Sequence, residues 1–232
     1  MLRGIGLEVH RIKPSCSTRQ IVSSLDQFNI DWVLDVGANQ GQFASTIRSA
    51  GYKGNIVSFE PLTDAHTALL RASTDDSKWH IHPRCALGDQ NGEIEINIAG
   101  NSVSSSILPM LQTHLNSAPE SLYQGKETVT IYTLDSVARR YLKTAHAPFL
   151  KIDTQGYEWQ VLEGAREILP QIQGVLLELS LLPLYEGQHL WREIIDWLEA
   201  EGFILWALLP VFIDPVAGRT LQFDGLFYRM KD

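Results

Sequence analysis

Acidic side chains close two apolar runs early in the chain, with a glycine-containing turn between them. The run Trp32–Val36 contains Asp35 and leads into the turn Gly37-Ala38-Asn39-Gln40-Gly41, and the run Ile56–Phe59 ends at Glu60. Glycines allow a sharp turn and a close approach of the backbone to a ligand. An acid at the tip of the next strand can accept hydrogen bonds from two ribose hydroxyls. This spacing is typical of a βαβ nucleotide-binding unit and predicts an adenosine-bearing cofactor.

Two further acids follow the same pattern later in the chain. Asp153 closes the run Phe149–Ile152, and Glu178 lies near the end of the run Val175–Leu179. Where strands alternate with helices, right-handed crossovers bring the carboxyl ends of parallel strands to one edge of a sheet. Ligands of open α/β sheets bind in the crevice at that edge. We therefore expect Asp35, Glu60, Asp153 and Glu178 to share one rim.

Alternating helix and strand patterns support this arrangement. Helices are expected over 17–28, 42–50, 61–73, 134–142, 157–169 and 190–201, and strands over 32–36, 55–59, 79–87, 93–98, 128–132, 149–153, 175–179, 203–208 and 225–229. Only a loop joins the final two strands, so at least one of them must be antiparallel. The pattern predicts an α/β fold with a mostly parallel sheet covered by helices on both faces.

The bulk properties fit one globular domain spanning residues 1–232. Hydrophobic residues make up 44% and charged residues 20% of the chain, and the formal net charge is −8, which argues against nucleic acid as the main partner. The two cysteines form no disulfide framework, so a cytoplasmic location is expected, and no apolar run is long enough for a transmembrane segment. Residues 1–30 are interpreted as an N-terminal arm and helix, and the polar, irregular residues 99–127 as a substrate or lid segment.

Several segments, taken in order, resemble class I S-adenosylmethionine-dependent methyltransferases and, more narrowly, the FkbM family. They cover most of residues 30–180: Val33–Gly41, Phe59-Glu60-Pro61, Ala86–Asp89 with Gly92-Glu93, Thr133-Leu134-Asp135, and Leu150–Glu158 with Val161–Ala165. The resemblance implies a Rossmann-like, seven-stranded sheet with an antiparallel last strand. It also implies methyl transfer to a hydroxyl of a saccharide, glycolipid or secondary metabolite. Two positions depart from common patterns: Asn39 replaces the middle glycine of Asp-x-Gly-x-Gly-x-Gly, and Gln155 stands where many relatives have Glu.

The resemblance implies S-adenosylmethionine as the cofactor and assigns a set of contacts to it. The N–H groups of the first turn and of the following helix suit the methionine carboxylate. Glu60 is expected to bind the ribose, and the segment Cys85-Ala86-Leu87 to border the adenine. The predicted cofactor residues are Asp35, Gly37, Asn39, Gly41, Phe59, Glu60, Ala86, Leu87 and Asp153.

Asp153 is also the first candidate for catalysis, because it ends the strand where methyl donor and acceptor would meet. It could orient the cofactor's sulfonium end or a substrate hydroxyl, or act with Glu178 as general base or as ligands of Mg²⁺. A sugar hydroxyl has a very high pKa, so its deprotonation needs a base or a Lewis acid. His189 and His114 are further candidate bases. Tyr185 and Trp191 could form an aromatic wall for a sugar ring.

Other functions remain open at this point. A Rossmann-type nicotinamide enzyme is one alternative, although residues 37–41 lack the GxGxxG spacing that brings the backbone close to a pyrophosphate. A methyltransferase-like domain that binds the cofactor without activity is a second, and an interaction module without cofactor is a third. The expected partner is a small-molecule or glycan hydroxyl acceptor, and the sequence leaves a homodimer open.

Overall fold

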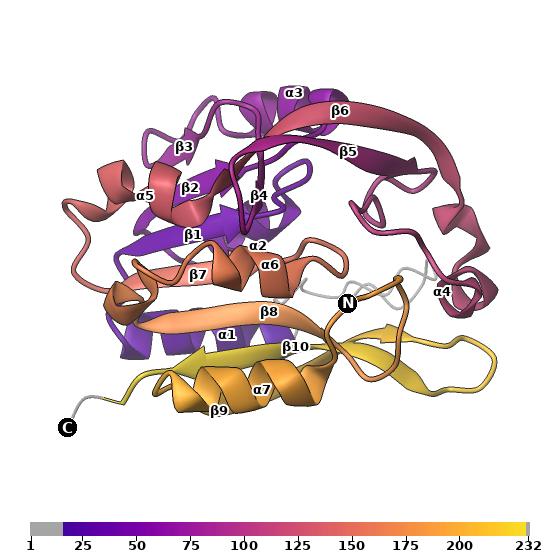
Figure 1. Ribbon diagram of the computed structural model, residues 1–232. Coiled ribbons are helices and arrows are strands. Elements are labelled where there is room, and N and C mark those ends of the chain that lie inside the picture. Colours follow the sequence, from indigo (N-terminus) through magenta and orange to yellow (C-terminus); the bar gives the residue numbers. More distant parts are fainter. Residues whose placement is uncertain (1–15, 231–232) are drawn as a thin grey trace, which may run out of the picture.

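A seven-stranded sheet forms the centre of the protein in the computed structural model, which describes residues 16–230 (Figure 1). Residues 1–15 of the expected N-terminal arm lie outside this range. The strand order is β3-β2-β1-β7-β8-β10-β9, and β10 alone runs against its neighbours. The strands are β1 (Trp32–Val36), β2 (Asn55–Phe59), β3 (Trp79–Ile81), β7 (Pro148–Ile152), β8 (Gly174–Ser180), β9 (Ile204–Ile213) and β10 (Thr220–Tyr228). The expected class I methyltransferase sheet, with an antiparallel last strand, is confirmed.

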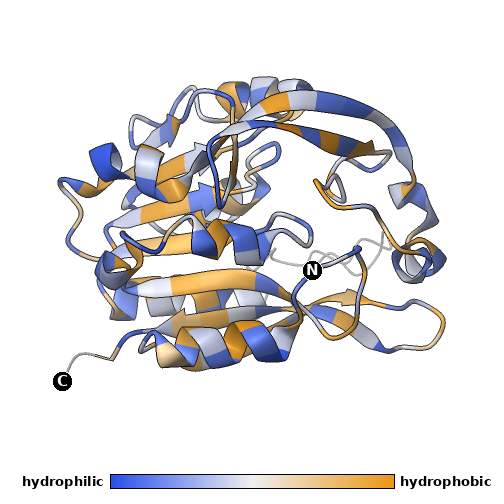
Figure 2. Ribbon diagram, in the orientation of Figure 1, coloured by the Kyte–Doolittle hydropathy of each residue, from blue (hydrophilic) through white to orange (hydrophobic). Residues whose placement is uncertain are grey.

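Helices cover both faces of this sheet. Its strands are rich in hydrophobic residues (Figure 2), and these residues divide between two buried clusters. On one face pack α1 (Cys16–Gln27), α2 (Gln42–Ser49) and Leu69 of α3 (Thr63–Ala72). On the other pack α5 (Leu134–Leu142), α6 (Glu158–Glu163) and α7 (Trp191–Ala200). None of the helices between residues 16 and 230 combines the length and the apolar character that crossing a bilayer requires.

A second, three-stranded sheet was not foreseen. It has the order β4-β6-β5, with β4 (Ala86–Gly88), β5 (Gly92–Ala99) and β6 (Tyr123–Thr133). The single strand expected over 79–87 is wrong: its first part pairs in the large sheet as β3 and its last part in the small sheet as β4. Pro83 lies between them, and a proline lacks the N–H that a continuous strand would use.

The segment between β5 and β6 is more ordered than its composition suggests. It contains α4 (Gln112–Ser117) and a short 3₁₀ turn, Pro119–Ser121. The strand β6 starts at Tyr123 rather than at 128, because it pairs with β5 along the whole length of that strand. This leaves residues 100–111 as the irregular part, and Figure 1 shows it returning from the far end of β5 toward the edge where the parallel strands end.

The helix expected over 157–169 ends early, at Glu163. A Cβ at Gly164 would lie 1.9 Å from the carbonyl oxygen of Gly88, so only glycine allows α6 to pack this closely on β4. The N–H groups of Glu167 and Ile168, beyond the helix end, donate to the Asp135 carboxylate at 3.0 and 2.9 Å. The close approach of Gly164 to Gly88 fixes the C-terminal end of α6 against the small sheet, and the bonds to Asp135 join the following turn to α5.

Candidate functional site

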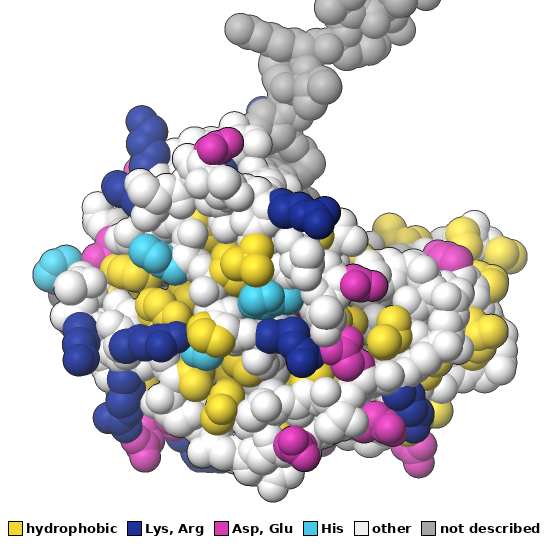
Figure 3. Space-filling view, turned by 90° about the horizontal axis from the view of Figure 1, so that it is seen from above, with side chains coloured by type: hydrophobic (Ala, Val, Ile, Leu, Met, Phe, Trp, Pro, Cys, Tyr) yellow, Lys and Arg dark blue, Asp and Glu magenta, His cyan; other side chains and the backbone are white. Residues whose placement is uncertain are grey.

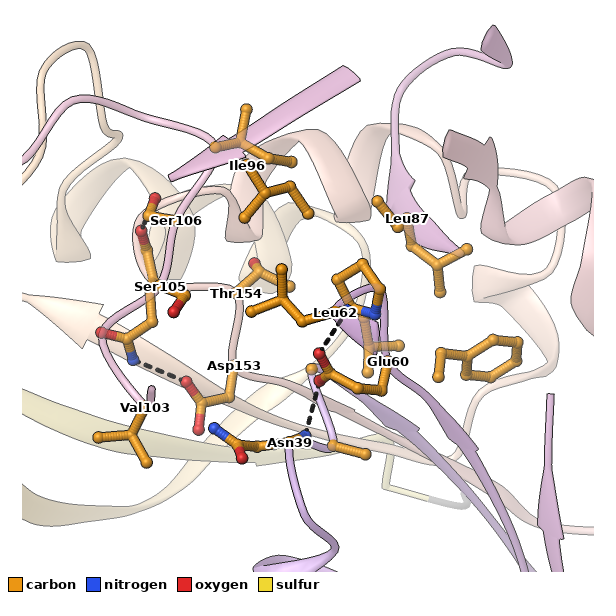
Figure 4. Close-up of a pocket in the computed structure, with 18 of the residues that line it drawn as sticks. Asn39, Glu60, Leu62, Leu87, Ile96, Val103, Ser105, Ser106, Asp153 and Thr154 are labelled. Atoms are coloured by element: carbon orange, nitrogen blue, oxygen red, sulfur yellow. Dashed lines mark hydrogen bonds between the residues drawn. The ribbon is translucent and has the colours of Figure 1, made fainter. Parts of the chain in front are cut away.

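A cavity opens where the parallel strands β1, β2 and β7 end, between the large and the small sheet. It encloses about 980 Å³ of space, counting the part open to solvent. The turn after β1, the ends of β2 and β7, strands β4 and β5 and the segment 102–107 all contribute to its wall. In Figure 4, Leu87 and Glu60 lie on one side of this cavity, and Asp153, Ser105 and Val103 on the other.

Glu60 directly follows β2, and its carboxylate forms part of the cavity wall. Its Oε2 accepts from the N–H of Asn39 at 2.8 Å and its Oε1 from the N–H of Leu62 at 2.9 Å (Figure 4). Burial raises the pKa of Glu60 to about 7, although both N–H donors favour the ionised form. Each carboxylate oxygen has two lone pairs, so each retains the capacity to accept one more hydrogen bond from a ligand.

The turn after β1 does not offer its N–H groups to a ligand, which corrects the expectation for the methionine carboxylate. The N–H groups of Gly37 and Ala38 both donate to the carbonyl of Phe59 at 3.1 Å, and that of Gly41 to Ala38. Those of Asn39 and Gln40 donate to the side chains of Glu60 and Gln42. The N–H groups that remain for a carboxylate are those of the first turn of α2, because they have no partners within the helix. Gln42 and Phe43 from this turn line the cavity.

Asn39 stands where the common motif has a glycine, and its backbone conformation and its side-chain oxygen both bear on the site. Its φ of 47° places it in the left-handed region, where Asn is tolerated better than most residues. Its side-chain Oδ1 is buried and has no hydrogen-bond partner among the described residues, although Asn39 lines the cavity. A buried acceptor without a donor is costly. It therefore marks a position where a bound molecule can supply an N–H or O–H.

Lys151, near the end of β7, forms the charged floor of the cavity. Its Nζ donates to the carbonyls of Gly37 and Val36 at 3.0 and 3.3 Å, and it lies 3.2 Å from Asp35 Oδ1 and 3.7 Å from Asp153 Oδ2. Burial disfavours the charged ammonium, but Asp35 and Asp153 outweigh this and hold the pKa of Lys151 above its ordinary value. The lysine is thus a fixed cation beneath the site.

Asp35 does not reach the rim where it was expected. It is fully buried, pairs with Lys151, and accepts from the Ser58 hydroxyl at 2.9 Å. It does not line the cavity, so the structure places it as the counter-ion of the lysine rather than in the wall. Sequence reasoning passed over Lys151, although a lysine inside a buried five-residue strand is itself an indication, because such a charge needs buried partners.

Asp153 and Glu178 are linked through an amide. The side chain of Asp153 is 43% exposed and lines the cavity. The Nε2 of Gln155 lies 2.8 Å from Asp153 Oδ1 and 3.0 Å from Glu178 Oε2, and its Oε1 accepts from the Tyr185 hydroxyl at 2.8 Å. Burial raises the pKa of Glu178 well above its usual range, and Asp153 raises it further.

This pair does not fit a magnesium ion. The amide nitrogen of Gln155 occupies the place between the two carboxylates that a bridging cation would take, and the Tyr185 hydroxyl fixes the orientation of the amide. Over residues 16–230, no three His, Cys, Asp or Glu side chains are grouped so that they could hold a metal. Asp153 and Glu178 therefore do not form a site for a divalent cation in this arrangement.

The wall opposite Asp153 is apolar. Phe59, Leu62, Ala86, Leu87 and Ile96 line it, and all of them are nearly fully buried. Burial also raises the pKa of the adjacent Cys85 thiol to about 12, so this cysteine remains a neutral wall residue. Flat, apolar surroundings of this kind suit the face of an aromatic base.

The segment 102–107 forms part of the cavity wall on the side of Asp153 (Figure 4). Ser102, Val103, Ser105, Ser106 and Ile107 all line the cavity. The hydroxyl of Ser106 donates to the carbonyl of Gln155 at 2.6 Å and accepts from the N–H of Leu108, which ties the segment to the loop after β7. Val103 is 51% exposed and so offers an apolar side chain at the entrance.

Besides Asp35 and Glu178, two further predicted residues do not line the cavity. His189 stacks on Trp159, with ring centroids 4.4 Å apart, and its Nδ1 lies 3.5 Å from Glu193. Gly41 does not line the cavity either; a Cβ there would meet the ring of Trp79 at 2.7 Å, so this glycine serves packing. The structure therefore does not bring His189 together with Asp153 and Glu178.

The aromatic wall expected from Tyr185 and Trp191 does not form. Tyr185 is fully buried beneath Gln155, and Trp191 packs against Phe223 in the core. His114 is also buried, with its ring 5.2 Å from that of Tyr185, and burial lowers its pKa to about 4. None of the three lines the cavity.

A second, shallower groove lies over α5 and the small sheet, on the face shown in Figure 3, where Lys and Arg side chains gather. Arg84, Arg139, Arg140 and Lys143 line it. Arg84 and Arg139 are paired with Glu127 and Glu167, so about half of this positive charge is compensated. His82, which is buried, also lines the groove, and burial lowers the pKa of its imidazole. None of the described residues that line the groove has a buried side-chain acceptor without a partner.

Comparisons with known proteins find a matching family profile and a curated relative. The family profile described as the methyltransferase FkbM domain matches residues 35–205. A curated relative, the 2-O-methyltransferase NoeI of Sinorhizobium fredii, is 27% identical over 207 residues, which are 85% of this chain and 83% of NoeI.

Two solved structures have a similar fold. TehB from Haemophilus influenzae has a TM-score of 0.50 at 9% identity, over 91% of this chain and 62% of TehB. The methyltransferase domain of bacterial CtHen1-CN has a TM-score of 0.50 at 12% identity, over 91% of this chain and 97% of that domain. At identities this low, the likeness shows the fold alone.

Proposed function

Because the chain belongs to the FkbM methyltransferase family, we propose that it is an S-adenosylmethionine-dependent O-methyltransferase whose acceptor is a hydroxyl of a saccharide, glycolipid or secondary metabolite. The observation that carries the proposal is the cavity itself. It places a buried carboxylate with free acceptor capacity, Glu60, between an unpaired amide oxygen and an apolar wall. The named activity of NoeI supports transfer to oxygen.

The residues of the cavity fit the parts of this cofactor. Glu60 would accept from the two ribose hydroxyls, and Asn39 Oδ1 would accept from the cofactor where it now lacks a donor. Leu62, Ala86, Leu87 and Ile96 would contact the adenine. The first turn of α2 would face the methionine carboxylate, because helix N-termini favour anions. When bound, S-adenosylmethionine supplies an electrophilic methyl group.

Asp153 is the proposed catalytic residue. Its carboxylate lines the cavity on the side opposite the apolar wall and is accessible. It would orient the acceptor hydroxyl and take its proton as the oxygen–carbon bond forms. Holding the hydroxyl in line with the methyl group supplies most of the remaining rate enhancement. Glu178, which reaches the site only through Gln155, would act indirectly.

The charges of the site favour an uncharged acceptor. Among the described residues lining the cavity, Lys151 is the one cation, and Asp35 and two backbone carbonyls already engage it. An anionic acceptor would meet Glu60 and Asp153 without a free cation. Hydroxyls of a neutral sugar meet no such repulsion. The segment 102–107 would cover the acceptor from the solvent side.

Turnover tests this proposal. The protein is incubated with methyl-labelled S-adenosylmethionine and a panel of acceptors: neutral mono- and oligosaccharides, acidic sugars, phenolic metabolites and, as nitrogen acceptors, simple amines. We expect label in neutral saccharides, with Asp153→Asn lowering kcat by about 100-fold or more while leaving the protein folded. Labelling of nitrogen acceptors alone, or full activity of the Asp153→Asn variant, would overturn the assignment.

A further inference from the structure

Gln155 connects four separate parts of the chain around the candidate catalytic acid. Its Nε2 donates to Asp153 in its own loop and to Glu178 in β8, at 2.8 and 3.0 Å. Its Oε1 accepts from Tyr185 in the loop after β8, and its backbone carbonyl accepts from Ser106 in the segment 102–107. The amide nitrogen, the amide oxygen and the backbone carbonyl of Gln155 therefore all form hydrogen bonds.

The backbone at Gln155 is held in an uncommon conformation. Its φ is 54°, in the left-handed region, which a residue with a long side chain rarely adopts. The following Gly156 has φ 98°, and a Cβ there would lie 2.8 Å from the ring of Tyr185. An uncommon backbone conformation persists only where several contacts hold it, and such conformations are concentrated at functional sites.

The amide lies among several carboxyl groups. Asp153 in the loop after β7 and Glu178 in β8 lie on either side of it. Asp224 in β10 stands opposite Glu178 in the strand register, and Glu158 in α6 is buried nearby. Lys151 lies 3.7 Å from the other oxygen of Asp153. With one N–H for each carboxylate, Gln155 keeps the two acids apart and holds one oxygen of Asp153.

We propose that Gln155 is a positioning residue, which fixes the Asp153 carboxylate so that the oxygen not bonded to Gln155 faces the acceptor hydroxyl. This inference rests on the proposed function, because it acts through Asp153. The Tyr185 hydroxyl positions Gln155 in turn, and the contact with Ser106 brings the segment 102–107 over the same point. Gln155 thereby links Asp153 to the segment 102–107.

A double-mutant cycle tests the inference. Gln155→Met keeps the size of the side chain and removes both N–H donors. We expect it to lower kcat by about 10- to 100-fold, the scale of a misplaced catalytic group. Its affinity for S-adenosylhomocysteine should stay within about threefold of wild type. In the Asp153→Asn background the same change should lower kcat by no more than about twofold, because the acid that it positions is gone.

Gln222 supplies the matched control. Its amide donates to Glu178 at 2.6 Å and to Ser180, but not to Asp153. Whatever Gln222→Met does to kcat, its effect should be the same in the wild-type protein and in the Asp153→Asn background. Equal losses from Gln155→Met in both backgrounds would overturn the positioning role while leaving the proposed function intact. Absence of methyl transfer by the wild-type protein would overturn the proposed function, and the positioning role with it.

Discussion

Glu60 combines deep burial with unfilled acceptor capacity. A carboxylate in this position ionises reluctantly, and burial accordingly raises its pKa from 4.5 to about 7. Between these two values the folded chain holds a proton that the unfolded chain releases, so ionising Glu60 lowers the free energy of unfolding as pH rises. Ribose hydroxyls would donate to the ionised carboxylate and recover part of that free energy on binding.

Cofactor binding should therefore be linked to a proton. Because hydroxyl donors favour the ionised form, affinity for S-adenosylhomocysteine should fall as pH is lowered through about 7, and binding near pH 6.5 should release a proton. Isothermal titration in buffers of different ionisation enthalpy measures this release. Glu60→Gln should abolish the pH dependence and weaken binding by about 1–3 kcal/mol.

Asp224→Asn is the control for this experiment. The pKa of Asp224 is also raised to about 7, chiefly by burial, but Asp224 does not line the cavity. This variant should retain the pH dependence of binding. If Glu60→Gln kept it as well, Glu60 would not be the ribose ligand.

At the scale of elements, the site depends on how closely the loops after β1 and β7 approach. A Cβ at Gly37 would lie 1.8 Å from the backbone carbonyl oxygen of Asp153, and Gly37 has φ 71°. The glycine thus brings the turn that carries Asn39 against the loop that carries Asp153. The glycine pair Gly88 and Gly164 does the same for β4 and α6.

Gly37→Ala should consequently disrupt the fold at the site. The positive φ and the clash together predict a loss of about 2–4 kcal/mol in the free energy of unfolding. Gly92→Ala, where a Cβ would meet nothing within 4 Å, should change it by less than about 0.5 kcal/mol. Urea denaturation of both variants measures the difference, and equal stabilities would contradict the close approach.

Local periodicity was sufficient to predict a mostly parallel sheet, most of its strands and helices and the acids at the strand ends, whereas the number of seven strands came from the family resemblance. It was not sufficient for contacts that depend on register. The N–H groups after β1 are taken up by Phe59 because β1 and β2 pair in parallel with Val36 opposite Phe59. Likewise Lys151 reaches Asp35 only because β1 and β7 are neighbours.

At the scale of the whole molecule, the cavity exists only because two sheets meet. The large sheet supplies the acids and the turn, whereas β4, β5 and the segment 102–107 supply the apolar wall and the cover. The small sheet could not be predicted from alternation alone, since β3 and β4 read as one continuous strand. A bound cofactor would contact both sheets and should stabilise the whole fold.

The most direct test of this account is a titration of the purified protein with S-adenosylhomocysteine, in EDTA and in magnesium, with NADH as the comparison. The account predicts micromolar binding of S-adenosylhomocysteine, the same in EDTA and in magnesium because Gln155 occupies the place between Asp153 and Glu178, and no binding of NADH. Absence of S-adenosylhomocysteine binding in a folded sample, or binding of NADH in its place, would contradict the central claim.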